Sequence, residues 1–293
     1  MISSNRDADG LPTDNCLSGG DEREARLRAI FPGKSEMAGR MRGLDWAATV
    51  LGPPELWPES LKHSVRLCLT SRFPIVIYWG LERTMLYNDP YIPFLGETKH
   101  PFYLGRASQE AWSDIWDSID PMFESVMRTG EATWSKDFLF FFARNLAREE
   151  VYVTFTVGPI LLEAGTVGGF FCPCTEVTEK VVGARRLETL RKLGAQALKT
   201  RTMDAVCEEA AEVLAENPND IPFGAIYLVN DAGTHAVLKS LAGFSQDAHP
   251  FPSAVSLAEG DLSPWPLASV LQARLAEETS DLTEAGLQLP GGP

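Results

Sequence analysis

The stretch that decides the fold is EEVYVTFTVGPILLEAGTVGGFFCPCTEVTEKVVGARRLETLR, residues 149–191. Over residues 151–157 every second residue is apolar, which is the pattern of a strand with one buried face. Residues 163–165 have the composition of a turn, so residues 167–174 are expected to return as the antiparallel partner strand. From residue 177 the apolar residues recur at three or four, which predicts that the chain leaves the sheet as an amphipathic helix. Strain in such a sheet can reach whatever follows the helix.

The predicted helix has an apolar seam of its own. Leu187, Leu190, Gly194 and Ala197 are spaced three and four apart, which suits two parallel helices packed against each other. The small residues permit close approach of the two backbones. In the alternative interpretation these residues pack only onto their own domains. We expect the seam, and with it a homodimer that passes a signal along the helix.

Length, composition and charge limit the class of protein. With 293 residues and 44% hydrophobic content, the chain can form two domains with separate cores. A formal net charge of -14 opposes binding to nucleic acid or an anionic membrane surface, so protein or small-molecule partners are expected. The sequence has no apolar run long enough to span a membrane and no secretory leader, so we expect a cytoplasmic protein.

Shifts in composition divide the chain into four parts. Residues 1–43 are polar and predict a largely disordered tail, with a loose helix over residues 21–28. Residues 44–178 predict an α+β domain and residues 179–201 a linker helix. Residues 202–293 form a second domain that is apparently incomplete.

The first domain is predicted to combine an antiparallel sheet with helices on one side. The expected helices cover residues 61–71, 91–95, 108–116 and 121–128. The expected strands cover residues 73–79, 84–87, 134–142, 151–157 and 167–174. Thr129-Gly130 is expected to end the last of the helices, because glycine readily takes the left-handed conformation of a helix stop.

A set of short phrases resembles a known sensor fold. LGPPELWP (51–58), SRFP (71–74), LYND (86–89), KHP (99–101) and LG (104–105) are similar to the PAS domains at the front of certain bacterial PAS-GAF sensor histidine kinases. The resemblance covers roughly residues 44–178. It implies a signal-input domain rather than a catalytic one.

The second domain resembles the opening of a GAF domain. A helix over residues 202–216 precedes a hairpin of strands 221–229 and 235–242, but the later strands of a GAF sheet are not evident in the sequence. Together the resemblances imply a sensory region that controls a downstream histidine kinase or another output. Two alternatives are a protein-interaction module without ligand sensing and a cofactor-bearing light or redox receptor.

Aromatic residues crowd the PAS-like domain. Either they form an ordinary core, or they surround a pocket for a small apolar or planar ligand. The candidate ligand-binding residues are Tyr87, Asn88, Trp112, Trp116, Phe138, Phe140 and Phe155.

The sequence offers no strong cofactor or catalytic motif. Cys172-Pro173-Cys174 places two thiols on one face of a strand, but a closed metal site needs more ligands, so small buried residues are the favoured interpretation. His100 is likewise interpreted as a satisfied polar residue rather than a haem ligand. We therefore expect no bound cofactor or metal, a colourless protein and no enzyme activity within this chain.

Overall fold

The chain divides into two units in a computed structural model. The structure describes residues 19–144, 148–197, 202–244, 250–258 and 265–278. The first unit ends at Val177 and the second begins at Thr178. Each unit is described separately below.

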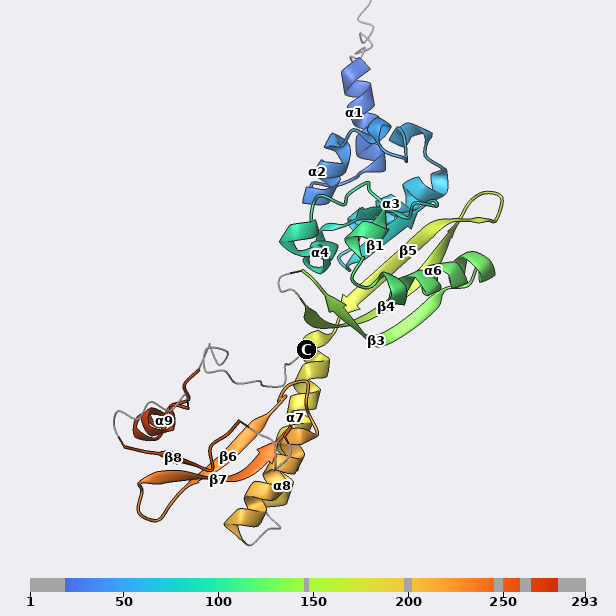
Figure 1. Ribbon diagram of the computed structural model, residues 1–293. Coiled ribbons are helices and arrows are strands. Elements are labelled where there is room, and N and C mark those ends of the chain that lie inside the picture. The colour runs from blue at the N-terminus through green and yellow to red at the C-terminus, as the bar shows by residue number, and fades with distance from the viewer. Residues whose placement is uncertain (1–18, 145–147, 198–201, 245–249, 259–264, 279–293) are drawn as a thin grey trace, which may run out of the picture. The chain divides into compact units, whose positions relative to one another are not determined.

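The first unit contains a five-stranded antiparallel sheet, with helices that precede its first strand in the chain and others that lie between its second and third strands (Figure 1). Its helices are α1 (Gly19–Ile30), α2 (Glu36–Gly43), α3 (Glu59–Thr70), α4 (Ile92–Lys99), α5 (Ser108–Ala111) and α6 (Trp116–Thr129), with short 3₁₀ turns at Trp46–Ala48, Pro54–Leu56 and Asp89–Tyr91. Its strands are β1 (Ile75–Trp79), β2 (Thr84–Tyr87), β3 (Thr133–Phe142), β4 (Glu149–Leu161) and β5 (Val167–Glu176).

The strand order is β2-β1-β5-β4-β3, and every pairing is antiparallel. The expected hairpin is confirmed: Phe155 lies opposite Cys174, and Gly165 takes a left-handed φ of 81° in the turn. β5 lies at the centre of the sheet, between β1 and β4. The α+β class and the PAS-like sheet are therefore as the sequence indicated.

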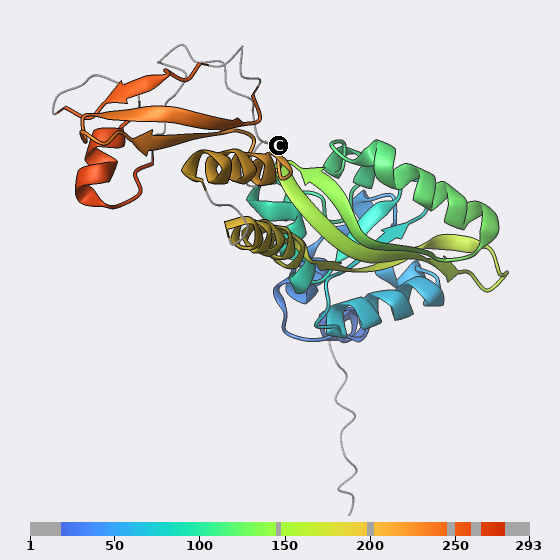
Figure 2. The same cartoon turned by 90° about the horizontal axis from the view of Figure 1, so that it is seen from below.

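Helices cover both faces of the sheet near β1, rather than one side only. All five residues of β1 are buried. Val76 and Tyr78 face the domain interior beneath α6, whereas Ile75 and Ile77 alternate to the opposite face, where α3 packs against the strand. Figure 2 shows α6 and α3 on opposite sides of the sheet. The predicted helices on one side of the sheet are therefore found on the face that lines the domain interior. Near β1, α3 also covers the other face.

The helices on the second face include part of the segment that was expected to be disordered. Residues 19–43 form α1 and α2, and Phe31, Met37 and Met41 have no exposed surface. The Asp89 carboxylate accepts hydrogen bonds from the backbone N–H groups of Glu36 and Met37, which anchors the start of α2. The segment is polar overall, so its composition did not indicate that these three apolar side chains are buried. Residues 1–18 lie outside the described residues.

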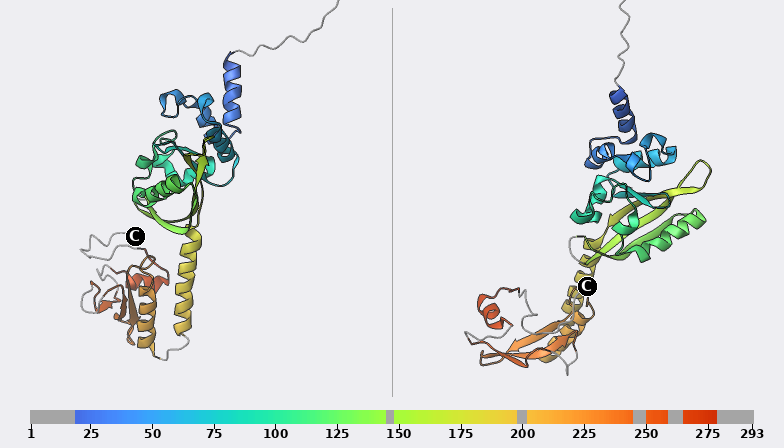
Figure 3. Two further views of the ribbon diagram at one scale, coloured as in Figure 1. Left: turned by 90° about the vertical axis from the view of Figure 1, so that its right-hand side faces the viewer. Right: turned by 45° about the horizontal axis from the view of Figure 1, so that its top comes forward.

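The second unit begins with α7 (Thr178–Ala197), which lies beside α8 (Met203–Ala215), as the left view of Figure 3 shows. A three-stranded antiparallel sheet follows, formed by β6 (Gly224–Val229), β7 (His235–Ala242) and β8 (Ala254–Ser256), and then α9 (Leu267–Ala273). The linker helix expected over 179–201 is thus α7 as far as residue 197, and residues 198–201 lie outside the described part. The β6–β7 hairpin agrees with the expectation.

Candidate functional site

A small cavity lies in the interior of the first unit, between the sheet and the helical segments that run from Tyr91 to α6. Its volume is about 60 Å³. Alternate residues of β1, β3, β4 and β5 supply one wall, because every second side chain of a strand faces the same way. The rest of the lining consists of phenylalanine, isoleucine, tyrosine and tryptophan side chains: Tyr91, Phe94, Trp112, Ile115, Ile119 and Phe123. The aromatic interior is therefore a packed core that encloses a small space.

The lining contains few polar groups. The hydroxyl oxygens of Tyr78 and Tyr91 lie 3.5 Å apart. The indole Nε1 of Trp112 is buried and has no hydrogen-bond partner within the described part of the chain. Cys172 and Cys174 place their thiols on the same wall. Three aromatic donors and two thiols thus face an otherwise apolar space.

Burial keeps these groups uncharged. It raises the pKa of the Tyr78 hydroxyl, and the nearby Trp112 N–H acts only weakly in the opposite sense. Burial likewise raises the pKa of Tyr91 and of the thiols of Cys172 and Cys174. A thiol that stays protonated is a poor nucleophile and a poor metal ligand. The structure confirms the prediction that both cysteines are small buried residues.

Three of the seven predicted ligand-binding residues line the cavity. They are Trp112, Phe140 and Phe155. Phe138 is half-buried and packs against Phe140 and Phe155 with centroid distances of 4.8 and 6.2 Å, outside the lining. Trp116 also lies outside it, with the Arg83 guanidinium 5.2 Å from its ring centroid. These two aromatics support the wall rather than form it.

Asn88 and Tyr87 are placed elsewhere by their own hydrogen bonds. The Asn88 amide accepts from the Ile75 N–H at 3.0 Å and donates to the carbonyls of Cys68 and Phe73 at 2.9 and 2.8 Å. It therefore ties the end of α3 to the start of β1. Its expected role as a ligand contact is not supported, because its polar atoms are already satisfied by backbone.

Tyr87 takes part in a polar chain away from the cavity. Its hydroxyl lies 3.0 Å from Nδ1 of His100, whose Nε2 lies 3.1 Å from a carboxylate oxygen of Glu36. The chain joins β2 to α2 and explains why Tyr87 does not face the interior. It also confirms the interpretation of His100 as a satisfied polar residue.

The sequence analysis did not select Tyr78 and Tyr91. Tyr78 belongs to the alternating strand β1, and its register with Val76 could have indicated that both face the interior. Tyr91 follows Pro90 in a 3₁₀ turn, where no simple periodicity predicts the direction of a side chain. The three buried donors come from separate elements, so their convergence depends on the tertiary fold.

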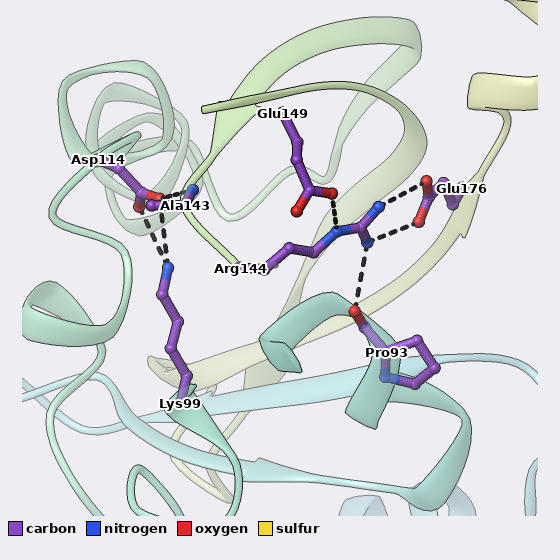
Figure 4. Close-up of polar contacts among 7 residues, drawn as sticks. All are labelled: Pro93, Lys99, Asp114, Ala143, Arg144, Glu149 and Glu176. Atoms are coloured by element: carbon purple, nitrogen blue, oxygen red, sulfur yellow. Dashed lines mark hydrogen bonds and ion pairs between the residues drawn. The ribbon is translucent and has the colours of Figure 1, made fainter. Parts of the chain in front are cut away.

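A second cluster of polar residues lies where β5 ends. Arg144 donates to both carboxylate oxygens of Glu176 at 2.9 and 3.0 Å, to Glu149 at 2.8 Å and to the Pro93 carbonyl at 3.2 Å (Figure 4). We call these four residues the Arg144 cluster. Hydrogen bonds to the two carboxylates, Glu176 foremost, raise the pKa of the guanidinium, so it stays charged. The cluster joins α4 and the start of β4 to the last residue of β5.

The backbone of α4 approaches this cluster closely. Gly96 interrupts α4 with a φ of 64°, and a Cβ at this position would lie 3.1 Å from Cβ of Arg144. Only glycine combines that conformation with that contact at low cost. Nearby, the Asp114 carboxylate accepts from Lys99 at 3.2 Å and from the Ala143 N–H at 2.8 Å. These contacts hold the end of β3 against the helices, as Figure 4 shows.

In the second unit, α7 has a buried side and an exposed apolar side. Thr189 is buried and accepts from the amide of Asn217, which follows α8. Leu187 and Leu190 are 67% and 65% exposed, and Gly194 is also exposed. Within the chain, the predicted seam residues Leu187 and Leu190 are therefore not packed onto their own unit. The side chain of Ala197 lies outside the described residues.

Several solved structures are similar to part of this chain. No protein-family model and no curated protein matches the chain. Among solved structures, the PAS domain of BvgS from Bordetella pertussis is 18% identical, with a TM-score of 0.34 over 45% of this chain and 97% of that chain. A sensory box sensor histidine kinase from Vibrio cholerae is 17% identical, with a TM-score of 0.30 over 41% of this chain and 92% of that chain.

Another similar structure is that of an RNA-binding light-oxygen-voltage receptor. It is 17% identical, with a TM-score of 0.34, and the match spans 61% of this chain and 65% of the receptor. Within the described residues, no helix is both long and apolar enough to span a bilayer, and no three His, Cys, Asp or Glu side chains are grouped to hold a metal ion.

Proposed function

We propose that this chain is a sensory region whose first unit registers a small molecule and whose helix α7 passes the change to an output through a dimer. The observation that supports this most directly is the course of β5. The strand carries Cys172 and Cys174 on the cavity wall, ends at Glu176 in the Arg144 cluster and continues through Val177 into α7. A change in the cavity wall thus has a short covalent path to the helix.

The Arg144 cluster supplies the mechanical part of this proposal. Its central side chain is only 11% exposed and its partners Glu149 and Glu176 are 15% and 30% exposed, so the ion pairs are partly shielded from water. A displacement of β5 alters the geometry at Glu176, whereas Pro93 and Glu149 hold Arg144 in place. The cluster therefore couples the position of the last β5 residue to α4 and β4.

The partner we propose for α7 is α7 of a second copy. Gly183, Leu187, Leu190 and Gly194 are exposed at spacings of four, three and four, which is the spacing of a two-stranded helical seam. Two such helices in parallel bury both leucines and meet closely at the glycines. The output beyond the seam is proposed to be a histidine kinase or similar domain, with the second unit as a GAF-like element between. The proposal assigns binding and transmission to this chain, not catalysis.

The oligomeric state tests this proposal directly. Leu187→Glu with Leu190→Glu puts four carboxylates into the seam of a dimer, and like charges at such positions oppose pairing. Multi-angle light scattering should give a dimer mass for the unaltered chain and a monomer mass for the double variant.

The matched control is Leu81→Glu, since Leu81 is 94% exposed in the turn between β1 and β2 of the first unit and is not a seam residue. This variant should remain a dimer. A monomeric unaltered chain, or a double variant that still dimerises, would contradict the proposed role of α7.

A further inference from the structure

The cavity wall carries no charge to balance an ionic ligand. Its ionisable members are Tyr78, Tyr91, Cys172 and Cys174, and burial keeps each of them in its neutral form at pH 7. An ion transferred from water into such a space loses its hydration without gaining a counter-charge. The ligand that fits this wall is neutral.

The donors define the polar feature of the ligand. Tyr78 and Tyr91 lie 3.5 Å apart at their oxygens, so only one of the two hydroxyl hydrogens can point between them. Among the described residues, the other hydroxyl hydrogen lacks an acceptor, and the Trp112 N–H has at most a weak interaction with the Tyr78 oxygen and no hydrogen bond of ordinary geometry. One oxygen with two lone pairs, such as a carbonyl oxygen, can accept from both.

The volume limits the rest of the molecule. A water molecule needs about 10–15 Å³ in a cavity, and a cavity of about 150 Å³ holds benzene. The 60 Å³ observed lies between these values, so the molecule that it holds is larger than water and smaller than benzene. A planar ring system, which was one of the two ligand types expected from the sequence, does not fit without displacement of the wall.

We propose that the cavity binds a small neutral carbonyl compound, such as a short ketone or aldehyde, whose oxygen accepts from Tyr78 and Trp112 while its carbon atoms contact the apolar wall. Tyr91 then donates to the Tyr78 oxygen and orients its hydroxyl. This inference rests on the proposed function, because it names the class of molecule that the sensory unit registers. The competing occupant is water, which can also accept from these donors.

Three probes of one shape separate these chemistries: acetone is neutral with one acceptor oxygen, acetate is charged and 2-methylpropene has no acceptor. The full chain is labelled with ¹⁵N-tryptophan, and its seven indole N–H resonances are followed during titration. Acetone should shift the Trp112 resonance saturably, whereas acetate should leave it unchanged. The resonance of Trp134, which is 67% exposed on β3, should not respond.

Two variants test the donors. Trp112→Phe keeps an aromatic wall but removes the N–H, and Tyr78→Phe removes the hydroxyl. Each should weaken acetone binding about three- to tenfold, the effect of one lost hydrogen bond, when followed through the remaining tryptophan resonances. Neither should weaken the binding of 2-methylpropene. Trp134→Phe is the control and should bind acetone like the unaltered chain.

Each contrary outcome has a defined meaning. If acetone gives no saturable shift, the cavity holds water only. If acetate binds as well as acetone, the wall does not select neutral ligands over charged ones. If both variants bind acetone as the unaltered chain does, the Tyr78 hydroxyl and the Trp112 N–H do not contact the ligand. Any of these overturns the inference but leaves the mass of the dimer untouched. A monomeric chain would instead overturn the proposed function while acetone binding remained measurable.

Discussion

At the scale of single residues, Asn88 shows how a side chain can resemble a ligand contact and serve the fold instead. It is 1% exposed, and its amide bonds to backbone groups on both sides of the loop between α3 and β1. Backbone groups left buried without partners are costly. Asn88 is therefore part of the scaffold that sets the position of β1, from which Tyr78 faces the cavity.

Asn88→Ala should destabilise the first unit by about 2–4 kcal/mol, because it leaves the buried Ile75 N–H without its partner and removes one donor each from the carbonyls of Cys68 and Phe73. Urea unfolding followed by tryptophan fluorescence measures this, since every tryptophan except Trp265 lies in the first unit. Asn230→Ala, in the exposed turn between β6 and β7, is the control and should leave this transition unchanged. An Asn88→Ala chain as stable as the unaltered one would mean that water satisfies the loop.

At the scale of elements, the alternation of side chains in strands was a better predictor than the glycine and proline residues that were taken to mark helix ends. The strand pair 149–176 was predictable because its side chains alternate between a buried face and an outer one. Gly130 ends α6 with a φ of 70°, as expected. The start of α6 was misplaced: it begins at Trp116, and Pro121 lies inside the helix, although proline usually marks a first turn. Local sequence patterns therefore predicted which elements form better than they predicted where each element begins and ends.

The contacts between elements were not predictable in the same way. Arg144 and Glu176 are 32 positions apart, and α2 meets His100 through Glu36 across 64 positions. No local period links such residues. The cavity illustrates the same limit: the aromatic-rich composition indicated its walls, whereas the meeting of Tyr78, Tyr91 and Trp112 required the folded chain.

Asp220 is the residue that ties α7 to α8 and predicts a pH effect. The carboxylate is 8% exposed and accepts from Arg185 at 2.8 and 3.0 Å and from Asn217 at 2.9 Å. The Arg185 guanidinium, despite partial burial, holds the pKa of the Asp220 carboxyl well below its usual range. A depressed folded-state pKa stabilises the unit above the unfolded-state pKa, near 4, and that contribution is lost as pH falls further.

Asp220→Asn should therefore lower the stability of the second unit by about 2 kcal/mol at pH 7, and the difference from the unaltered chain should shrink below about pH 4. Urea unfolding followed through the Trp265 indole resonance reports this unit. Glu188→Gln, which removes only an exposed pair with Arg191, is the control and should change little at either pH. A difference that stays constant down to pH 3 would show that the charge of Asp220 is not what stabilises the unit.

At the scale of the whole molecule, the proposed signal depends on the angular phase of α7. An α-helix turns by about 100° per residue, so four inserted residues rotate everything downstream by about 40° and seven by only about 20° in the opposite sense. Four residues also break the spacing of Leu187 and Leu190 relative to the helix before them, whereas seven preserve a heptad. The four-residue insertion adds less length, about 6 Å against about 10.5 Å, but changes the phase more.

Insertion of four helix-forming residues after Ala184, in the chain fused to its natural output, should change basal or signal-dependent activity, and insertion of seven should largely preserve both. Light scattering should be recorded for both, because the downstream seam remains intact and each protein should stay dimeric. The seven-residue insertion is the control for length, since it moves the output farther away than the four-residue insertion does. Equal activity for the unaltered chain and both insertions would exclude helix phase as the carrier of the signal, even if the protein is a dimer.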